Sequence, residues 1–141
     1  MAERIVLQLS VEPCGKGRPR FGNGRTYTDA KTKAYEQALG WTAKQTMGSR
    51  RPLTGALHVA VFAHMGIPKS WTKADKQAAT AGAIHHIGTP DADNILKSLD
   101  ALNGICWRDD AQIVHAEVVK RYAAEPSLTI HIEELAGGAD E

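Results

Sequence analysis

Five aspartates and one lysine lie within twenty residues in the second half of the chain. They are Asp91, Asp93, Lys97, Asp100, Asp109 and Asp110. Residues 91–110 carry a net charge of −3, because these five aspartates are opposed there only by the lysine and one arginine. Carboxylates brought together repel one another unless a cation lies between them, and oxygen ligands are those that Mg²⁺ prefers. The segment is therefore a candidate Mg²⁺ site for phosphodiester chemistry, at which Mn²⁺ is expected to substitute.

A helix expected over residues 92–102 would position these groups. Asp93, Lys97 and Asp100 are spaced at i, i+4 and i+7, so they share one helix face. The apolar residues that share another face, able to enter the core, are Ile95, Leu99 and Leu102. The spacing thus predicts a helix that separates ionic from apolar side chains.

A purely structural interpretation exists for each of these residues. Asp91 could cap the helix, and Asp93 and Lys97 could form a surface ion pair worth a few tenths of a kcal/mol. Asp109 and Asp110 could simply form a turn. For one residue alone the structural interpretation is favoured; the combination of five carboxylates and a lysine favours a metal site.

A basic segment precedes this acidic one. Residues 14–33 hold six basic side chains against one aspartate, a net charge of +5 in a chain whose overall charge is +1. The residues predicted to contact phosphates are Lys16, Arg18, Arg20 and Arg25. A flexible, solvated loop is the alternative. Phe21 and Tyr27 could stack on unpaired bases, although packing within the protein is the favoured interpretation.

Periodicity and turn residues predict a single α+β domain with a mixed, mainly antiparallel sheet and helices packed on it. Strands are expected at 5–11, 25–27, 56–65, 112–123 and 127–134, and a loop or irregular ribbon at 13–24. Helices are expected at 72–80 and 92–102, and a further helix, capped by Thr28 or Asp29, is expected to run through about Met47. The last two strands should form an antiparallel pair joined across Glu125–Pro126. The first helix should bury either Ala34, Ala38, Trp41 and Gln45, or Leu39 and Ala43.

Composition limits the remaining possibilities. At 141 residues, with 43% hydrophobic and 23% charged residues, the chain fits one domain, expected over 1–136 with a disordered tail at 137–141. No apolar run approaches the roughly 20 residues of a membrane span, and the N-terminus lacks the pattern of a secretory signal, so a cytoplasmic protein is expected. Cys14 and Cys106 lack zinc-site spacing and should be reduced and at least half-buried. The tryptophans 41, 71 and 107 should be core anchors or dimer contacts.

Three motifs lie in this region: Pro-Asp-x-Asp-Asn-x-x-Lys from Pro90 to Lys97, Asp-Ala-Leu-Asn-Gly from Asp100, and Asp-Asp-x-Gln-Ile from Asp109. Together they resemble the signature of the RusA family of Holliday-junction resolvases. Residues 17–21, 25–27 and 85–86 are similar to the N-terminal loop and the pre-motif segment of the same family. Thr89 departs from the pattern, because many relatives have a basic residue there.

The resemblance implies that Asp91, Asp93 and Asp110 are the metal-binding carboxylates and that Lys97 is an essential lysine. It also implies a homodimer whose two active sites nick a four-way junction symmetrically, in DNA recombination and repair. The roles of His85, His86 and Asp109 stay open, as does the choice between four-way junctions and other branched DNA.

A non-catalytic module that binds branched DNA is the alternative function, in which the acidic residues serve the structure only. A phosphoacceptor domain also uses aspartates and a lysine, but it would place the aspartate pair early and the lysine late. The order here is reversed, so that class is excluded.

Overall fold

The computed structural model describes residues 4–15, 20–22, 25–27 and 30–135. The strands are β1 (Arg4–Leu9), β2 (Arg20–Gly22), β3 (Arg25–Tyr27), β4 (Leu57–Gly66), β5 (Ile113–Ala123) and β6 (Ser127–Glu134). The helices are α1 (Ala30–Met47), α2 (Lys73–Thr80) and α3 (Ala92–Lys97), with 3-10 turns η1 (Ser98–Leu102) and η2 (Asp110–Gln112). The expected tail at 137–141 lies outside the described residues.

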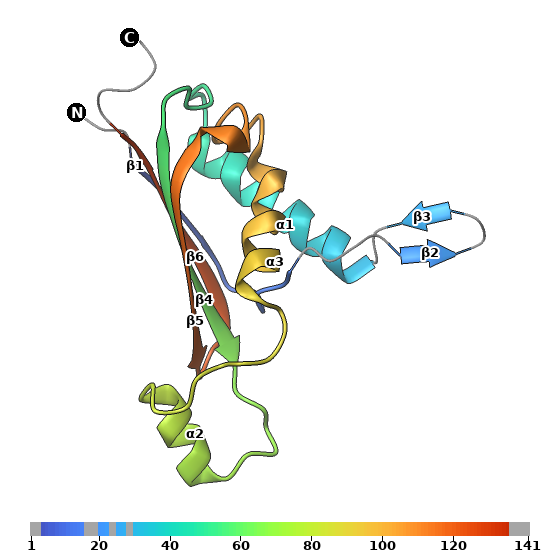
Figure 1. Ribbon diagram of the computed structural model, residues 1–141, viewed down its shortest axis with the longest axis vertical. Helices are drawn as coiled ribbons and strands as arrows, with labels where there is room; N and C mark the ends of the chain where they lie inside the picture. The colour runs from blue at the N-terminus through green and yellow to red at the C-terminus, as the bar shows by residue number, and fades with distance from the viewer. Residues whose placement is uncertain (1–3, 16–19, 23–24, 28–29, 136–141) are drawn as a thin grey trace.

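Four strands form one mixed sheet in the order β1-β6-β4-β5. β6 pairs antiparallel with both β1 and β4, whereas β5 pairs parallel with β4. Helix α1 packs against β1 and η1, α3 packs against β5 and continues into η1, and α2 lies beyond one end of the sheet (Figure 1). The predicted α+β class with a mainly antiparallel sheet is therefore confirmed.

The predicted pairing of the last two strands is wrong. β5 and β6 exist at the expected residues, but β4 lies between them and forms hydrogen bonds with both. β4 carries buried residues on both of its faces, such as Val59, Ala60 and Val61. Every residue of β4 is buried or half-buried, and a strand covered on both faces is most favourably placed inside a sheet, so β4 separates two strands that are neighbours in sequence.

Helix α1 packs on the sheet through one row of side chains, namely Tyr35, Leu39, Ala43 and Met47. These positions recur every four residues, which keeps them on one helical face. The prediction that named Leu39 and Ala43 is confirmed, and the one that placed Trp41 inside is wrong because its surface is 65% exposed. Gly48 ends the helix with a φ of +57°, a conformation that glycine adopts at little cost.

The motif helix is shorter than expected. α3 ends at Lys97, and η1 continues the same path with tighter 3-10 winding to Leu102. Ile95, Leu99 and Leu102 are all buried, as their spacing predicts. Trp107 is fully buried behind them and donates from Nε1 to Asn103 Oδ1 at 2.6 Å, so it is a core anchor. Trp71 is half-buried, and its ring packs edge-on against Tyr122.

The basic segment forms a separate two-stranded ribbon. β2 and β3 pair antiparallel through Arg20↔Tyr27, Phe21↔Thr26 and Gly22↔Arg25, so the expected short strand at 25–27 pairs with part of the segment expected to be a loop or irregular ribbon. The ribbon projects away from the sheet and helices (Figure 1). Among the described residues, no helix has both the length and the apolar character needed to cross a membrane.

Candidate active site

The N-terminus of α3 displays the first group of predicted residues. Asp91 is the N-cap, and its Oδ1 accepts a hydrogen bond of 2.8 Å from the Asn94 backbone N–H. One turn further on, Lys97 Nζ lies 3.1 Å from Asp93 Oδ2. All three charged side chains are exposed. Asp91 therefore caps the helix and Asp93 forms an ion pair with Lys97, as the structural interpretation of these residues predicts. Because the side chains are exposed, their other carboxylate oxygens are accessible to a ligand.

Two neighbouring segments hold this helix start in place. Gly15 packs so closely against it that a Cβ at this position would lie 2.8 Å from Pro90 Cβ and 2.7 Å from Asn94 Cβ. From the other side, Lys120 Nζ donates to the carbonyl oxygens of Gly88 at 2.8 Å and Pro90 at 2.9 Å. The backbone that leads into Asp91 is therefore held between Gly15, in the segment that follows β1, and Lys120 on β5.

A cleft of about 430 Å³ opens beside Pro90 and Asn94. Its lining residues are Glu12, Pro13, Cys14, Gly15, Lys31, Met65, His86, Thr89, Pro90 and Asn94. The cleft joins the motif helix to the first turn of α1, which follows the basic ribbon along the chain. Asp91 and Asp93 do not line this cleft, although Pro90 and Asn94, which flank them in sequence, do.

The two histidines before the motif occupy different environments. His86 lines the cleft and packs edge-on against Tyr122, while His85 is exposed and borders a second cleft along the end of β5. Burial lowers the pKa of His86, and the positive charge of Lys120 lowers it further. His86 is therefore held toward its neutral form next to the motif.

Asp109 and Asp110 lie at the start of η2, the 3-10 turn that leads into β5. Asp109 caps η2 by accepting from the Ala111 backbone N–H at 2.8 Å, and Gln112 Oε1 accepts in return from the backbone N–H of Asp109. Gln112 also donates to the carbonyl oxygens of Leu53 and Gly55. Asp110 is exposed, and this capping box fixes the backbone that carries it.

The structure does not bring Asp110 to the other two aspartates within one chain. Asp110 lies in η2, three residues before Ile113, which begins β5, whereas the backbone before Asp91 is held by Lys120 further along the same strand. A strand advances about 3.3 Å per residue, so the seven steps from Ile113 to Lys120 cover roughly 23 Å. Accordingly, among the described residues the ligand atoms of Asp91, Asp93 and Asp110 form no group within metal-binding distance.

Comparison with known proteins identifies the family of the chain. The family model described as Endodeoxyribonuclease RusA matches residues 10–133 of the chain. The chain belongs to the RusA endodeoxyribonuclease family. A protein of Bacillus subtilis (strain 168), named Uncharacterized protein YqaN, is 34% identical over 142 residues, which cover 94% of this chain and 97% of that protein.

Membership of the RusA family makes the coarse activity that of a nuclease acting on DNA. The match includes the α3 motif, the Asp109–Asp110 turn and the basic segment, so every predicted site residue lies inside it. The side chains of Lys16, Arg18, Arg20 and Arg25 lie outside the described residues, although β2 and β3 show the backbone path of two of them.

Sequence reasoning missed Lys120 and Gly15 as supports of the RusA motif. Lys120 alternates in phase with Val118 and Tyr122, which places a lysine on the face of β5 that packs against the core. A charged residue at an inward strand position was the available signal. Gly15 gave none, because its close contact with Pro90 and Asn94 exists only after folding.

Proposed function

We propose that this protein is a Mg²⁺-dependent endonuclease that resolves Holliday junctions by paired nicks and acts as a homodimer in DNA recombination and repair. The observation that carries the proposal is the exposed start of α3, where Asp91 caps the helix and Asp93 pairs with Lys97 within a sequence that matches the RusA family. Mn²⁺ should substitute for Mg²⁺, because both ions accept carboxylate and water ligands.

The donor chemistry at α3 suits Mg²⁺. Asp91 and Asp93 offer exposed carboxylate oxygens, and Mg²⁺ is usually held by one or two carboxylates while water and phosphate oxygens fill its octahedron. When bound, such an ion supplies an activated water and charge stabilisation at the scissile phosphate. Lys97, held beside Asp93, would offset negative charge on the phosphate oxygens or position the attacking water.

The separation of Asp110 from α3 suggests how a dimer would complete the site. If Asp110 is a metal ligand, the distance along β5 requires that it meet Asp91 and Asp93 of a second copy. Each active site would then combine the α3 carboxylates of one subunit with Asp110 of the other. A four-way junction offers two equivalent strands, which suits a two-fold symmetric pair of such sites.

DNA binding is assigned to the basic ribbon and the segment before it. Lys16, Arg18, Arg20 and Arg25 supply positive charge there, and the ribbon projects from the body of the protein where it can follow a DNA arm. Each lost phosphate contact reduces the dependence of log K on log salt by about 0.9 for duplex DNA. Replacing Arg20 and Arg25 by alanine should therefore weaken junction binding and flatten its salt dependence by about 2, whereas an unchanged slope would show that the ribbon does not touch DNA.

The decisive experiment uses a synthetic immobile four-way junction and a matched linear duplex, each incubated with the protein and Mg²⁺ or EDTA. Nicks are mapped on all four strands. Mg²⁺-dependent nicks at symmetric positions on opposing strands of the junction alone are expected. Binding without cleavage, across several divalent ions, would overturn the nuclease proposal.

Aspartate-to-asparagine variants test the site residues with little effect on the fold. Asparagine caps helices about as well as aspartate, so Asp91→Asn keeps the hydrogen bond to Asn94 and removes only the charge. We expect Asp91→Asn, Asp93→Asn and Asp110→Asn to abolish cutting and to retain junction binding. Asp75→Asn is the matched control, because Asp75 is an exposed aspartate in the first turn of α2. Equal losses of binding and cutting in all three variants would assign them a folding role.

Mixed dimers test whether the active site is shared. One subunit carries Asp91→Asn and the other Asp110→Asn, with different affinity tags so that the heterodimer can be isolated. In a shared arrangement one site contains both substitutions and the other contains neither, so nicking of a single strand should return. If each site belongs to one chain, both sites are defective and no nick appears, although the nuclease proposal would still stand.

A non-catalytic module for branched DNA is the second candidate. The capping roles of Asp91 and Asp109 and the ion pair of Asp93 with Lys97 favour it, since each of these residues has a structural use. The junction experiment separates the two candidates, because a module binds the junction and leaves every strand intact.

A further inference from the structure

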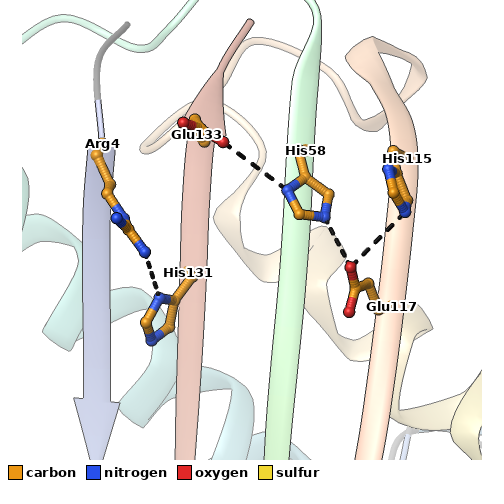
Figure 2. Close-up of polar contacts among 6 residues, drawn as sticks. All are labelled: Arg4, His58, His115, Glu117, His131 and Glu133. Carbon is orange, nitrogen blue, oxygen red and sulfur yellow. Dashed lines mark hydrogen bonds and ion pairs between the residues drawn. The ribbon is translucent and has the colours of Figure 1, made fainter.

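A second group of titratable side chains lies on the face of the sheet that points away from the core. Figure 2 shows these residues on four adjacent strands. They are Arg4, His58, His115, Glu117, His131 and Glu133. Glu117 and Lys120 are three residues apart on β5, so their side chains point to opposite faces of the sheet. This group is therefore separated by the sheet from the backbone that Lys120 holds before Asp91.

Three of these residues converge. His58 on β4 and His115 on β5 are register partners with ring centroids 4.3 Å apart, and Glu117 projects from the same face of β5. Glu117 Oε2 lies 3.0 Å from His58 Nε2 and 3.7 Å from His115 Nε2. One ligand atom from each residue falls within 4.8 Å of the other two. Among the described residues, this is the one group of three or more His, Cys, Asp or Glu side chains that meets this condition.

These distances match the edges of a metal coordination polyhedron. A tetrahedral Zn²⁺ ion has bonds of about 2.0–2.1 Å to nitrogen and oxygen, which places its ligand atoms about 3.4 Å apart. The separations of 3.0 and 3.7 Å from Glu117 lie on either side of that value, and the ligand atoms of all three residues lie within 4.8 Å of one another, as binding of one shared ion requires. Strands β4 and β5 pair in parallel, and after a register shift between Leu57 and His58 the pairing is regular from His58↔His115 onward, which fixes the positions from which the three side chains extend.

The donor set selects the class of ion. Two of the three ligands are imidazole nitrogens, which suit Zn²⁺, Co²⁺, Ni²⁺ and Cu²⁺, whereas Mg²⁺ and Ca²⁺ prefer oxygen ligands throughout. Three protein ligands on an exposed surface leave the remaining positions to water. The second nitrogen of His58, Nδ1, lies 3.9 Å from Glu133 Oε1. A carboxylate behind a metal-binding imidazole is a common outer contact that orients the ring.

We propose that His58, His115 and Glu117 form a binding site for a divalent transition-metal ion of the Zn²⁺ class, distinct from the carboxylates of α3. The ion would join the edge strand β5 to the central strand β4 near the start of their pairing. Because β5 follows directly after η2, the ion would also stabilise the backbone near Asp110. The proposal does not depend on the nuclease activity.

Metal titration of the full-length, metal-free protein tests the site. Zn²⁺ binding is measured by calorimetry, and Co²⁺ binding by the visible absorption that follows coordination. Both are repeated in the Asp91→Asn/Asp93→Asn background, so that the α3 carboxylates cannot supply the signal. In that background, His115→Gln and Glu117→Gln should each weaken binding of both ions at least about a hundredfold, and Glu133→Gln about tenfold, the lower end of typical outer-contact effects.

His131→Gln is the matched control, because His131 lies on the same face and contacts Arg4 and Phe62 rather than the cluster. It should bind as the parent does. His115 is exposed on the sheet edge, so His115→Gln should keep the parent's metal-free unfolding curve and lose only the stabilisation that added Zn²⁺ gives. Zn²⁺ and Co²⁺ affinities unchanged by His115→Gln and Glu117→Gln, or displacement of either ion by millimolar Mg²⁺, would overturn the proposal.

Discussion

Replacing Gly15 by alanine should separate catalysis from binding, because the glycine sets the position of the residues before and within α3. A Cβ here would lie 2.7–2.8 Å from Asn94 Cβ and Pro90 Cβ, whereas carbon atoms in contact prefer about 3.5–4.0 Å. The neighbouring backbone must therefore move by about 1 Å. Displacement of catalytic groups by about 1 Å can reduce a rate by two orders of magnitude.

The assay is single-turnover cleavage of a four-way junction, with junction affinity and urea unfolding measured on the same preparations. Gly15→Ala should lower the cleavage rate about a hundredfold, destabilise the fold by about 1–3 kcal/mol as overpacking does, and leave junction affinity close to that of the wild type. Gly40→Ala is the control, since its added Cβ would meet only Ile105 Cδ1 at 3.8 Å and alanine favours the helix. A Gly15→Ala protein that cuts at the wild-type rate would refute the inference that this contact positions Asp91.

Three further predictions concern Lys120, His86 and Cys106. Lys120→Met removes the two hydrogen bonds to the carbonyls of Gly88 and Pro90, so kcat for junction cleavage should fall more than junction affinity. Lys120→Arg should keep part of the activity that Lys120→Met loses. Equal effects of both substitutions would contradict a positioning role for Lys120. Because burial and Lys120 lower the pKa of His86, its contribution to stability is present above pH 6.5 and is lost as the pH falls from 6.5 through the lowered folded-state pKa. The stability of the wild type relative to His86→Gln, from urea unfolding across this range, should therefore decrease as the pH falls, whereas a constant difference would contradict the assignment. Burial raises the pKa of Cys106 to about 11, so a thiol reagent at pH 8 should label Cys14 in the folded protein and Cys106 only after unfolding. Equal labelling rates of Cys14 and Cys106 in the folded protein would show that the core around Cys106 opens readily.

The local elements follow from the sequence because their causes are local. Alternation around Ile5, Leu7 and Leu9 predicts β1, and the glycine after Met47 marks the end of α1. The acidic motif is likewise readable, since Asp91 caps α3 and Asp93 pairs with Lys97 through short-range spacing alone. The α+β class and the candidate chemistry can therefore be predicted from the sequence alone.

Contacts between distant segments depended on the tertiary structure. The sequence does not indicate that β4 lies between β5 and β6, because the order of strands is set by which strand is most favourably buried on both faces. Nor does it indicate that Lys120 supports Pro90, that Gly15 contacts Asn94, or that His58 and His115 meet across two strands. The separation of Asp110 from Asp91 along β5 has the same origin. Spacing along a chain determines which residues share a helix or a strand face, but the distance between two elements is fixed only when their side chains pack into one core.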